Sequence, residues 1–154
     1  RQDLFNGAIG SMVNFVQDNE SKSSKGVLRG LHYQVSPFSQ SKLVKVIEGR
    51  VLDVAVDIRR SSPTFGHHVA IELSSDNKKQ LYIPKGFAHG FVVLSDSATF
   101  TYKVDSLYAP EYERSIAFDD KDLKIDWQLS TDILKLSNKD IILVKLSNAK
   151  DLFD

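Results

Sequence analysis

The sequence predicts an all-β protein in which short antiparallel strands form a barrel or sandwich, with a short helical tail at the C-terminal end. Two observations lead to this fold class. Short apolar or alternating runs recur along the chain, and turn-forming residues separate them at close spacing. The length of 154 residues, with 42% hydrophobic and 26% charged residues, suits one ordinary globular domain. No repeat or linker divides the chain, so we expect a single domain over residues 1–154.

The clearest strand lies at residues 51–58, where apolar side chains at even positions alternate with Asp53, Ala55 and Asp57. Residues 42–48 read as the strand before it, and the short Glu48-Gly49-Arg50 turn between them predicts a hairpin. Further strands are predicted at 67–73, 81–83, 90–94 and 98–104, with turn residues at 61–63, 74–77, 84–86 and 95–97.

Helical signal comes only late in the chain. Ser137-Asn-Lys-Asp140 precedes the apolar run Ile141–Val144, which is the pattern of a capping box that opens a short helix. We therefore expect a small helical tail after the strands.

Composition narrows the function. The chain has 20 Lys and Arg against 20 Asp and Glu, so its net charge gives no reason to expect nucleic-acid or membrane binding. It has no Cys, which excludes disulfides and thiol catalysis. No apolar run is long enough to span a bilayer and no signal segment opens the chain, so a cytoplasmic location is expected.

The most informative short motif is Pro84-Lys-Gly-Phe-Ala-His89-Gly90, which resembles the second motif of the cupins, double-sheet jelly-roll barrels. Metal-binding cupins add a His-x-His pair and a Glu, but residues 26–34 contain one His only. His67 and His68 are adjacent and would point to opposite faces of a strand. We expect no metal and no cofactor, and a metal-dependent cupin oxygenase is a minor alternative.

A longer series of motifs resembles the dTDP-4-dehydrorhamnose 3,5-epimerase family, in the right order from about residue 13 to residue 140. The matching segments are Phe15-Val-Gln-Asp-Asn19, Ser21, Ser23, Gly26-Val-Leu-Arg-Gly-Leu-His-Tyr-Gln34, Lys42-Leu-Val44, Asp53-Val-Ala-Val-Asp-Ile-Arg59, Ser62-Pro-Thr-Phe-Gly66, Leu81-Tyr-Ile-Pro-Lys-Gly-Phe-Ala-His-Gly-Phe91, Tyr102-Lys103, Tyr108-Ala-Pro110, Glu113 and Ile125-Asp-Trp127.

The resemblance implies a metal-free cupin enzyme of dTDP-rhamnose biosynthesis that supplies a lipopolysaccharide, O-antigen or cell-wall polysaccharide. Its substrate would be a dTDP-sugar, and it would convert dTDP-4-keto-6-deoxyglucose to dTDP-4-keto-rhamnose by inverting carbons 3 and 5. Both carbons flank the ketone, so removal of a proton gives an enolate. Such a site needs a base, a cation for the enolate oxygen and an acid on the opposite face. A homodimer is expected from the family.

The resemblance assigns the catalytic roles residue by residue. His32 matches the general base of the family. An imidazole suits this role, since it exchanges protons near neutral pH. Asp140 matches the carboxylate that orients this base, although it is also a member of the capping box. Asp53 is the next candidate for that carboxylate.

Lys42 would stabilise the enolate oxygen, and Tyr102 matches the acid on the opposite face. Strand parity groups Lys42 with Val44 and Val46, and Tyr102 with Phe100 and Val104, so both side chains are expected to point into the barrel. A surface lysine and a core tyrosine are the plainer alternatives for these two positions.

Five further residues match substrate-binding positions. Arg29 offers a planar fork for a diphosphate, Gln17 and Asn19 match polar contacts to the nucleotide, and Tyr108 matches an aromatic that stacks on thymine. His89 matches a residue of the sugar pocket, and its alternative role is support of the turn at Pro84.

Two matters stay open at the level of sequence. Family members begin further upstream with an Arg-Gly-Phe-Phe-Glu-like motif that residues 1–12 do not match, so this family segment is expected to be missing here, which puts nucleotide affinity and dimer packing in question. The alternatives in function are a single-position epimerase or a 3,4-ketoisomerase on a related dTDP-sugar, and a catalytically silent cupin that binds sugar nucleotides.

Overall fold

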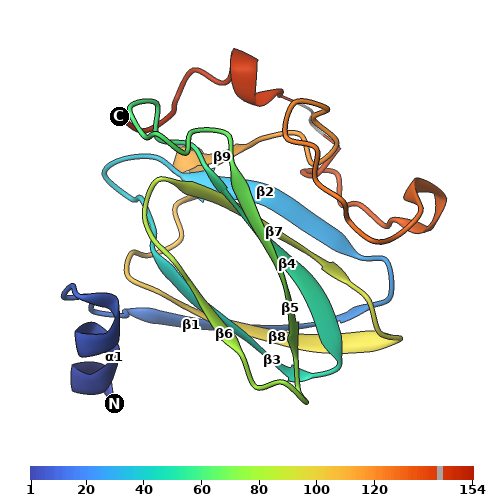
Figure 1. The fold of residues 1–154 in the computed structure, drawn as a ribbon, viewed down its shortest axis with the longest axis horizontal. Helices are drawn as coiled ribbons and strands as arrows, with labels where there is room; N and C mark the ends of the chain where they lie inside the picture. The colour runs from blue at the N-terminus through green and yellow to red at the C-terminus, as the bar shows by residue number, and fades with distance from the viewer. Residues whose placement is uncertain (142–143) are drawn as a thin grey trace.

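Two antiparallel β-sheets face each other, and the C-terminal part of the chain lies against one of them (Figure 1). The computed structural model describes residues 1–141 and 144–154. The elements are α1 (Gln2–Ile9), β1 (Gln17–Ser24), β2 (Leu28–Gln34), β3 (Lys42–Glu48), β4 (Arg50–Asp57), β5 (His68–Ser74), β6 (Gln80–Ile83), β7 (Phe87–Val93), β8 (Ser97–Val104), β9 (Glu113–Ser115) and the 3₁₀ turns η1 (Pro110–Tyr112), η2 (Thr131–Ile133) and η3 (Leu146–Asn148).

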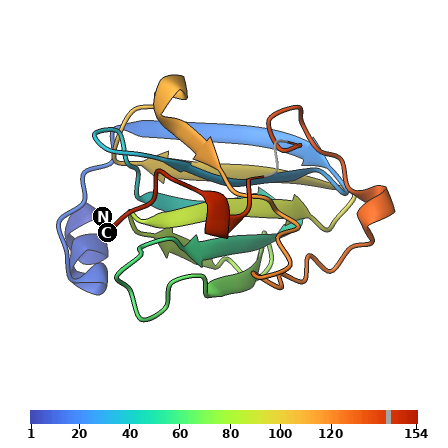
Figure 2. The same ribbon diagram turned by 90° about the horizontal axis from the view of Figure 1, so that it is seen from above.

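One sheet has four strands in the order β1-β8-β3-β6, and the other has five in the order β5-β4-β7-β2-β9. Seen from above, the C-terminal segment, drawn in red, crosses in front of the strands (Figure 2). The predicted fold class, an all-β double-sheet barrel, is confirmed, and the strands predicted at 42–48, 51–58, 67–73, 81–83, 90–94 and 98–104 all overlap observed strands.

The predicted hairpin at Gly49 is wrong, because β3 and β4 lie in different sheets. β3 pairs with β6 and β8, and β4 pairs with β5 and β7, so both edges of each strand are already occupied. Gly49 forms the corner between the sheets with φ of 75°, where a Cβ would lie 2.1 Å from the carbonyl oxygen of Ser97. Only glycine fits a corner that combines this conformation with so close an approach.

The alternation in β4 has both of its faces buried. Leu52, Val54 and Val56 belong to an apolar cluster under the C-terminal segment, to which Trp127 and Leu146 contribute. The odd-numbered side chains of β4 face the space between the sheets, where a second apolar cluster includes Val44, Val46, Val51, Ala55, Phe91 and Phe100. Because the C-terminal segment covers the outer face of the five-stranded sheet, the functional cavity forms inside the barrel.

The helices differ from the prediction. An N-terminal helix, α1, was not predicted; its Phe5 packs 5.4 Å from Phe15 and 5.5 Å from Tyr82, measured between ring centroids. Gly10 ends it in the left-handed conformation, a stop signal that the sequence does contain. No helix of the described residues is long and apolar enough to cross a membrane.

The predicted C-terminal helix is not an α-helix in the part that the structure describes. Residues 138–141 form a turn, the last described elements are the 3₁₀ turns η2 and η3, and residues 142–143 of the predicted helix lie outside the described residues. Half of the capping box is present nevertheless, since the Asp140 carboxylate accepts the backbone N–H of Ser137 at 3.2 Å. The Asp140 carboxylate also contacts Gly30 and His32 of β2, and these contacts favour a turn at residues 138–141.

The turn after β4 is organised by Asp57, whose side chain is buried. It accepts hydrogen bonds from the Arg59 guanidinium at 2.6 and 2.9 Å and from the Ser62 and Thr64 hydroxyls, each at 2.6 Å. Burial alone would raise the pKa of the Asp57 carboxyl, but these hydrogen bonds outweigh it and hold the pKa well below its usual range.

Asp57→Ala is expected to lower the free energy of unfolding by about 2 kcal/mol or more, because several donors lose a buried partner. A lowered pKa means that the stabilisation is fully present above the unfolded pKa of about 3.9 and fades as the pH falls below it. The difference between wild type and variant should therefore shrink from pH 7 to pH 3 in denaturant titrations. Asp76→Ala, at an exposed turn position, is the control, and an equal loss in both variants would contradict this account.

Candidate active site

The site begins with a β-bulge in β2. Arg29 pairs with Phe91 and His32 pairs with His89 on the neighbouring strand β7, so Gly30 and Leu31 together oppose a single residue of β7. In a regular strand, residues three apart point to opposite faces, whereas one extra residue brings them to the same face. Arg29 and His32 both line the interior cavity for this reason.

Two glycines permit the bulge. A Cβ at Gly30 would lie 2.4 Å from the Cα of Gly90, and a Cβ at Gly90 would lie 2.6 Å from the carbonyl oxygen of Arg29. The two backbones therefore approach closer than any side chain allows. This approach places His32 and His89 beside each other in the ladder.

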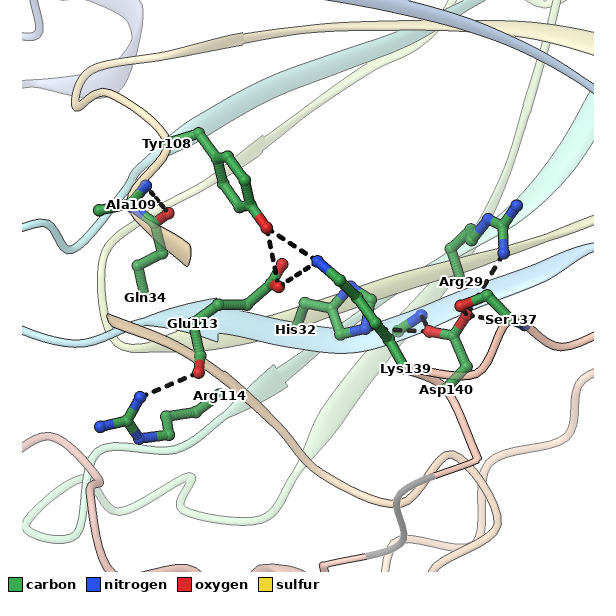
Figure 3. Close-up of polar contacts among 11 residues, drawn as sticks. Arg29, His32, Gln34, Tyr108, Ala109, Glu113, Arg114, Ser137, Lys139 and Asp140 are labelled. Atoms are coloured by element: carbon green, nitrogen blue, oxygen red, sulfur yellow. Dashed lines mark hydrogen bonds and ion pairs between the residues drawn. The ribbon is translucent and has the colours of Figure 1, made fainter. Parts of the chain in front are cut away.

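His32 contacts Asp140, as the sequence analysis predicts. Its Nε2 lies 2.9 Å from Oδ1 of Asp140, an ion-pair distance, although the direction of approach departs from that of a regular hydrogen bond. Figure 3 shows the imidazole and the carboxylate facing each other. A carboxylate in this place orients the ring and stabilises it when it carries a proton.

Asp140 is held on several sides. The backbone N–H of Gly30 donates to Oδ1 at 3.0 Å, the Ser137 hydroxyl donates to Oδ2, and an Arg29 guanidinium nitrogen lies 3.4 Å from Oδ2. Burial raises the pKa of the Asp140 carboxyl, but His32, Ser137 and the Gly30 N–H together outweigh burial and keep the pKa well below its usual range. The carboxylate thus stays charged at neutral pH, and its capping role and its contact with His32 are compatible.

Lys42 and Tyr102 enter the site from the four-stranded sheet, in agreement with the predicted strand parity. Lys42 lies at the start of β3 and Tyr102 on β8, and both line the same interior cavity as His32, which comes from the five-stranded sheet. The base candidate and the acid candidate therefore belong to opposite walls. Burial, followed by the nearby Glu113, raises the pKa of Tyr102, so its hydroxyl keeps its proton.

Burial lowers the pKa of Lys42 to about 8, with Asp53 and Glu113 acting in the opposite direction. If its ammonium group stabilises the enolate, kcat/KM should fall as the pH rises through about 8, because the neutral amine cannot do so. Lys42→Arg keeps the charge at all accessible pH values and should remove this alkaline decline. A variant whose pH profile still falls with the same midpoint would show that another group causes it.

His89 pairs with Asp53, which corrects the alternative in which Asp53 partners His32. The Nε2 of His89 lies 3.1 and 3.0 Å from the two Asp53 oxygens, and both side chains are buried. Burial lowers the pKa of His89, against the opposing effect of Asp53. His89 lines the interior cavity near Phe91 and Phe100, the position that its predicted role in the sugar pocket requires.

Gln17, Asn19 and Tyr108 lie together at another cavity, beside the interior one. The Tyr108 N–H donates to the Gln17 side-chain oxygen at 3.2 Å, and Gln17 Nε2 donates to Asn19 Oδ1 at 2.8 Å. The Tyr108 hydroxyl donates to Glu113 at 3.0 Å and accepts from Lys139 at 2.8 Å (Figure 3). Tyr108 as a whole remains 46% exposed, which leaves area for a planar ligand.

The two cavities adjoin. The first, of about 290 Å³, has Gln17, Asn19 and Tyr108 in its wall. The second, of about 350 Å³, has Arg29 and His89 in its wall. They share three lining residues, which are His32, Lys42 and Tyr102. All nine predicted site residues therefore line these cavities or, for Asp140, contact a residue that does.

The sequence analysis gave no site role to Glu113 and Lys139, which form an ion pair of 2.7 Å at the Tyr108 hydroxyl. Hydrogen bonds to Glu113 and Tyr108 raise the pKa of Lys139. Burial raises the pKa of Glu113, but its bonds to Lys139 and Tyr108 outweigh this and lower it overall. Glu113 was part of the family motif, and Lys139 directly precedes Asp140, so both signals were available. Ser21 and Ser23 also belong to the matching motifs without a predicted site role, and they line the second cavity.

A search for metal ligands gives no candidate centre. Within residues 1–141 and 144–154, no three His, Asp or Glu side chains come together in an arrangement that would hold an ion. The titratable groups at the cavities include His32 and His89, each paired with a carboxylate, together with Lys42 and Tyr102, and such groups can transfer protons.

A histidine–carboxylate pair, a lysine and a tyrosine on facing walls of a double-sheet barrel define an enzyme of the cupin type that transfers protons at carbon next to a carbonyl. The comparisons identify it further. The family model for dTDP-4-dehydrorhamnose 3,5-epimerase matches residues 1–148. The chain belongs to the dTDP-4-dehydrorhamnose 3,5-epimerase family.

Individual relatives agree. A dTDP-4-dehydrorhamnose 3,5-epimerase from Shigella flexneri is 56% identical over 140 residues, which are 91% of this chain and 76% of that protein. The solved structure of a dTDP-6-deoxy-D-glucose-3,5-epimerase from Legionella pneumophila, in complex with dTDP-4-keto-L-rhamnose, has a TM-score of 0.92 at 52% identity and covers 96% of this chain and 77% of that one. A 3'-monoepimerase from Streptomyces bikiniensis, in complex with dTDP-quinovose, has a TM-score of 0.87 at 35% identity and covers 96% and 74%.

Proposed function

We propose that this protein converts dTDP-4-keto-6-deoxyglucose to dTDP-4-keto-rhamnose by inverting carbons 3 and 5 of the sugar. The observation that carries the proposal is the placement of His32 and Tyr102 on opposite walls of one cavity, whose lining also includes Lys42. Inversion needs a proton to leave one face of a carbon and another to arrive on the other face, and facing sheets supply both groups.

Each half of the reaction uses the same groups. His32, oriented by Asp140, removes the proton from the carbon beside the ketone, and the electron pair of that C–H bond moves into the enolate. The Lys42 ammonium stabilises the negative charge on the enolate oxygen. Tyr102 then donates its proton to the opposite face of the carbon, and exchange with water restores the imidazole and the phenol. A second round at the other carbon completes the double inversion.

The substrate is held by the remaining residues. Arg29, whose guanidinium is partly exposed beside the catalytic pair, binds the diphosphate. Gln17 and Asn19 bind the nucleotide, and the thymine base stacks on the exposed face of Tyr108. His89, which Asp53 holds from behind on the five-stranded sheet, contacts the sugar.

The reaction can be tested by identifying the product. After incubation with dTDP-4-keto-6-deoxyglucose, the ketone is reduced with borohydride and the sugar is released and analysed. Rhamnose and 6-deoxytalose would show double inversion, as proposed. 6-Deoxyglucose and fucose alone would come from unchanged substrate and would contradict the proposal.

A single-position epimerase is the second candidate, and it is favoured by the similarity to the Streptomyces bikiniensis 3'-monoepimerase. It would use the same base and acid at one carbon only. In the same experiment, 6-deoxyallose and 6-deoxygulose would reveal inversion at carbon 3 alone.

We also propose that the enzyme is a homodimer with a two-fold axis, the commonest symmetry of soluble oligomers. β1 is an edge strand of the four-stranded sheet, and Val16 and Met12 beside it are exposed apolar side chains. Such an edge favours pairing with a second copy. Sedimentation equilibrium should give twice the mass of one chain, and a monomer at micromolar concentration would contradict this.

We place the enzyme in the cytoplasm, as part of dTDP-rhamnose supply for surface polysaccharide. A nucleotide sugar carries a charged diphosphate and does not cross a bilayer unaided, so the enzyme must share a compartment with the enzymes that make its substrate. Fractionation of the host cells should recover the protein with cytoplasmic markers, and recovery outside the cell membrane would contradict this location.

A further inference from the structure

Gln34 lies at the end of β2, two residues beyond His32 on the same face of the strand. Gln34 is buried, with 4% exposure, although glutamine lies on the surface in most proteins. A buried amide has to find partners for its donors and its acceptor. The partners of Gln34 belong to two loops, one that follows β2 and one that follows β8 and carries Tyr108, a residue of the first cavity.

The amide joins these loops through three hydrogen bonds. Its nitrogen donates to the carbonyl oxygens of Phe38 at 2.7 Å and Leu107 at 3.1 Å. Its oxygen accepts the backbone N–H of Ala109 at 2.8 Å (Figure 3). Both N–H groups of the amide are used, and two carbonyl acceptors and one N–H donor define its orientation.

The residue between Leu107 and Ala109 is Tyr108. Gln34 therefore holds the backbone immediately before and immediately after the aromatic ring, and Gln17 holds the Tyr108 N–H. A side chain that fixes both neighbours of a residue restricts the direction of its Cα–Cβ bond, and hence the plane that the ring can offer to a ligand.

We propose that Gln34 is a positioning residue that sets the Tyr108 ring for stacking on the nucleotide base, and so contributes to substrate affinity without touching the substrate. Gln34 lines the first cavity, but both N–H groups of its amide are bound to protein carbonyls, so it has no donor left for a ligand. Gln34 acts in this way only if Tyr108 carries the base, as proposed above. Its effect belongs to binding of the nucleotide and not to proton transfer at the sugar.

The test is a double-mutant cycle of Gln34→Met and Tyr108→Ala, with Kd for dTDP from calorimetry and kcat and KM for the sugar nucleotide. Tyr108→Ala should raise the Kd for dTDP about tenfold or more, as expected for loss of a stacked base. Gln34→Met should raise Kd and KM about three- to tenfold while kcat stays within about twofold. In the Tyr108→Ala background, Gln34→Met should add less than about twofold, because the residue through which it acts is gone. Gln80→Met, at an exposed glutamine, is the control and should change nothing.

The outcomes separate the two ideas. An unchanged Kd for dTDP in Tyr108→Ala would overturn base stacking, and with it the role of Gln34. Weaker binding in Tyr108→Ala but not in Gln34→Met would overturn only the role of Gln34. The same fold-change from Gln34→Met in both backgrounds, or a fall in kcat with unchanged KM, would also overturn it. Should Gln34→Met fail to fold, Gln34→Glu keeps the size and the acceptor for Ala109 but loses donation to two carbonyls, and the same cycle applies.

Discussion

Replacing His32 with alanine is expected to abolish hydrogen exchange at both carbons of the sugar. His32 is the imidazole that a charged carboxylate orients at 2.9 Å, and it faces Lys42 and Tyr102 across the cavity. A positioned general base contributes about 10²- to 10⁴-fold, and one base serves both rounds of the reaction, so turnover should fall by at least this factor. Steady-state rates and deuterium incorporation, both measured for the variant, check the expectation.

Two companion variants sharpen this experiment. His67→Ala removes an exposed histidine far along the chain from the site and should leave the rate unchanged. Asp140→Asn keeps the shape of the carboxylate but not its charge, and should lower kcat about 10²-fold or more because the ring loses its orienting partner. A His32→Ala enzyme with near-wild-type turnover would show that another group is the base.

Tyr102→Phe is expected to separate exchange from inversion. His32 would still remove a proton and return one from solvent to the same face, so label should enter the sugar while the configuration is retained at one or both carbons. Inversion should fall about 10²- to 10⁴-fold, the usual contribution of a positioned acid. NMR of the substrate in deuterated water distinguishes labelled starting material from labelled product.

Tyr82→Phe is the matched control, since Tyr82 packs against Phe5 of α1 and lines neither cavity. It should have wild-type activity. If Tyr102→Phe inverted both carbons at the normal rate, the acid would have to be sought elsewhere on the four-stranded sheet.

Local sequence pattern was sufficient to predict much of this site. Alternation within residues 42–46 and 100–104 was enough to predict that Lys42 and Tyr102 point inward, because strand parity is a local property. Motif resemblance pointed to His32, Asp140 and the other candidates in the chain, and the structure places them in the walls of two adjoining cavities or, for Asp140, against His32 in that wall.

Features that depend on distant partners escaped prediction. Strand pattern does not reveal which edges a strand pairs with, so the turn at Gly49 was taken for a hairpin although the chain changes sheet there. Regular periodicity would place Arg29 and His32 on opposite faces, and only the approach of Gly30 to Gly90 explains the bulge that unites them. The pairing of His89 with Asp53 joins β7 to β4, and it likewise depends on the sheet order.

The most direct test of the central claim, that His32 and Tyr102 transfer protons on opposite faces of carbons beside the ketone, is incubation of the wild-type enzyme with dTDP-4-keto-6-deoxyglucose in deuterated water. We predict that NMR will show deuterium at both carbon 3 and carbon 5 of a rhamno-configured ketone. Bound substrate without label at either carbon would contradict the claim, because a site that removes no proton there cannot be an epimerase.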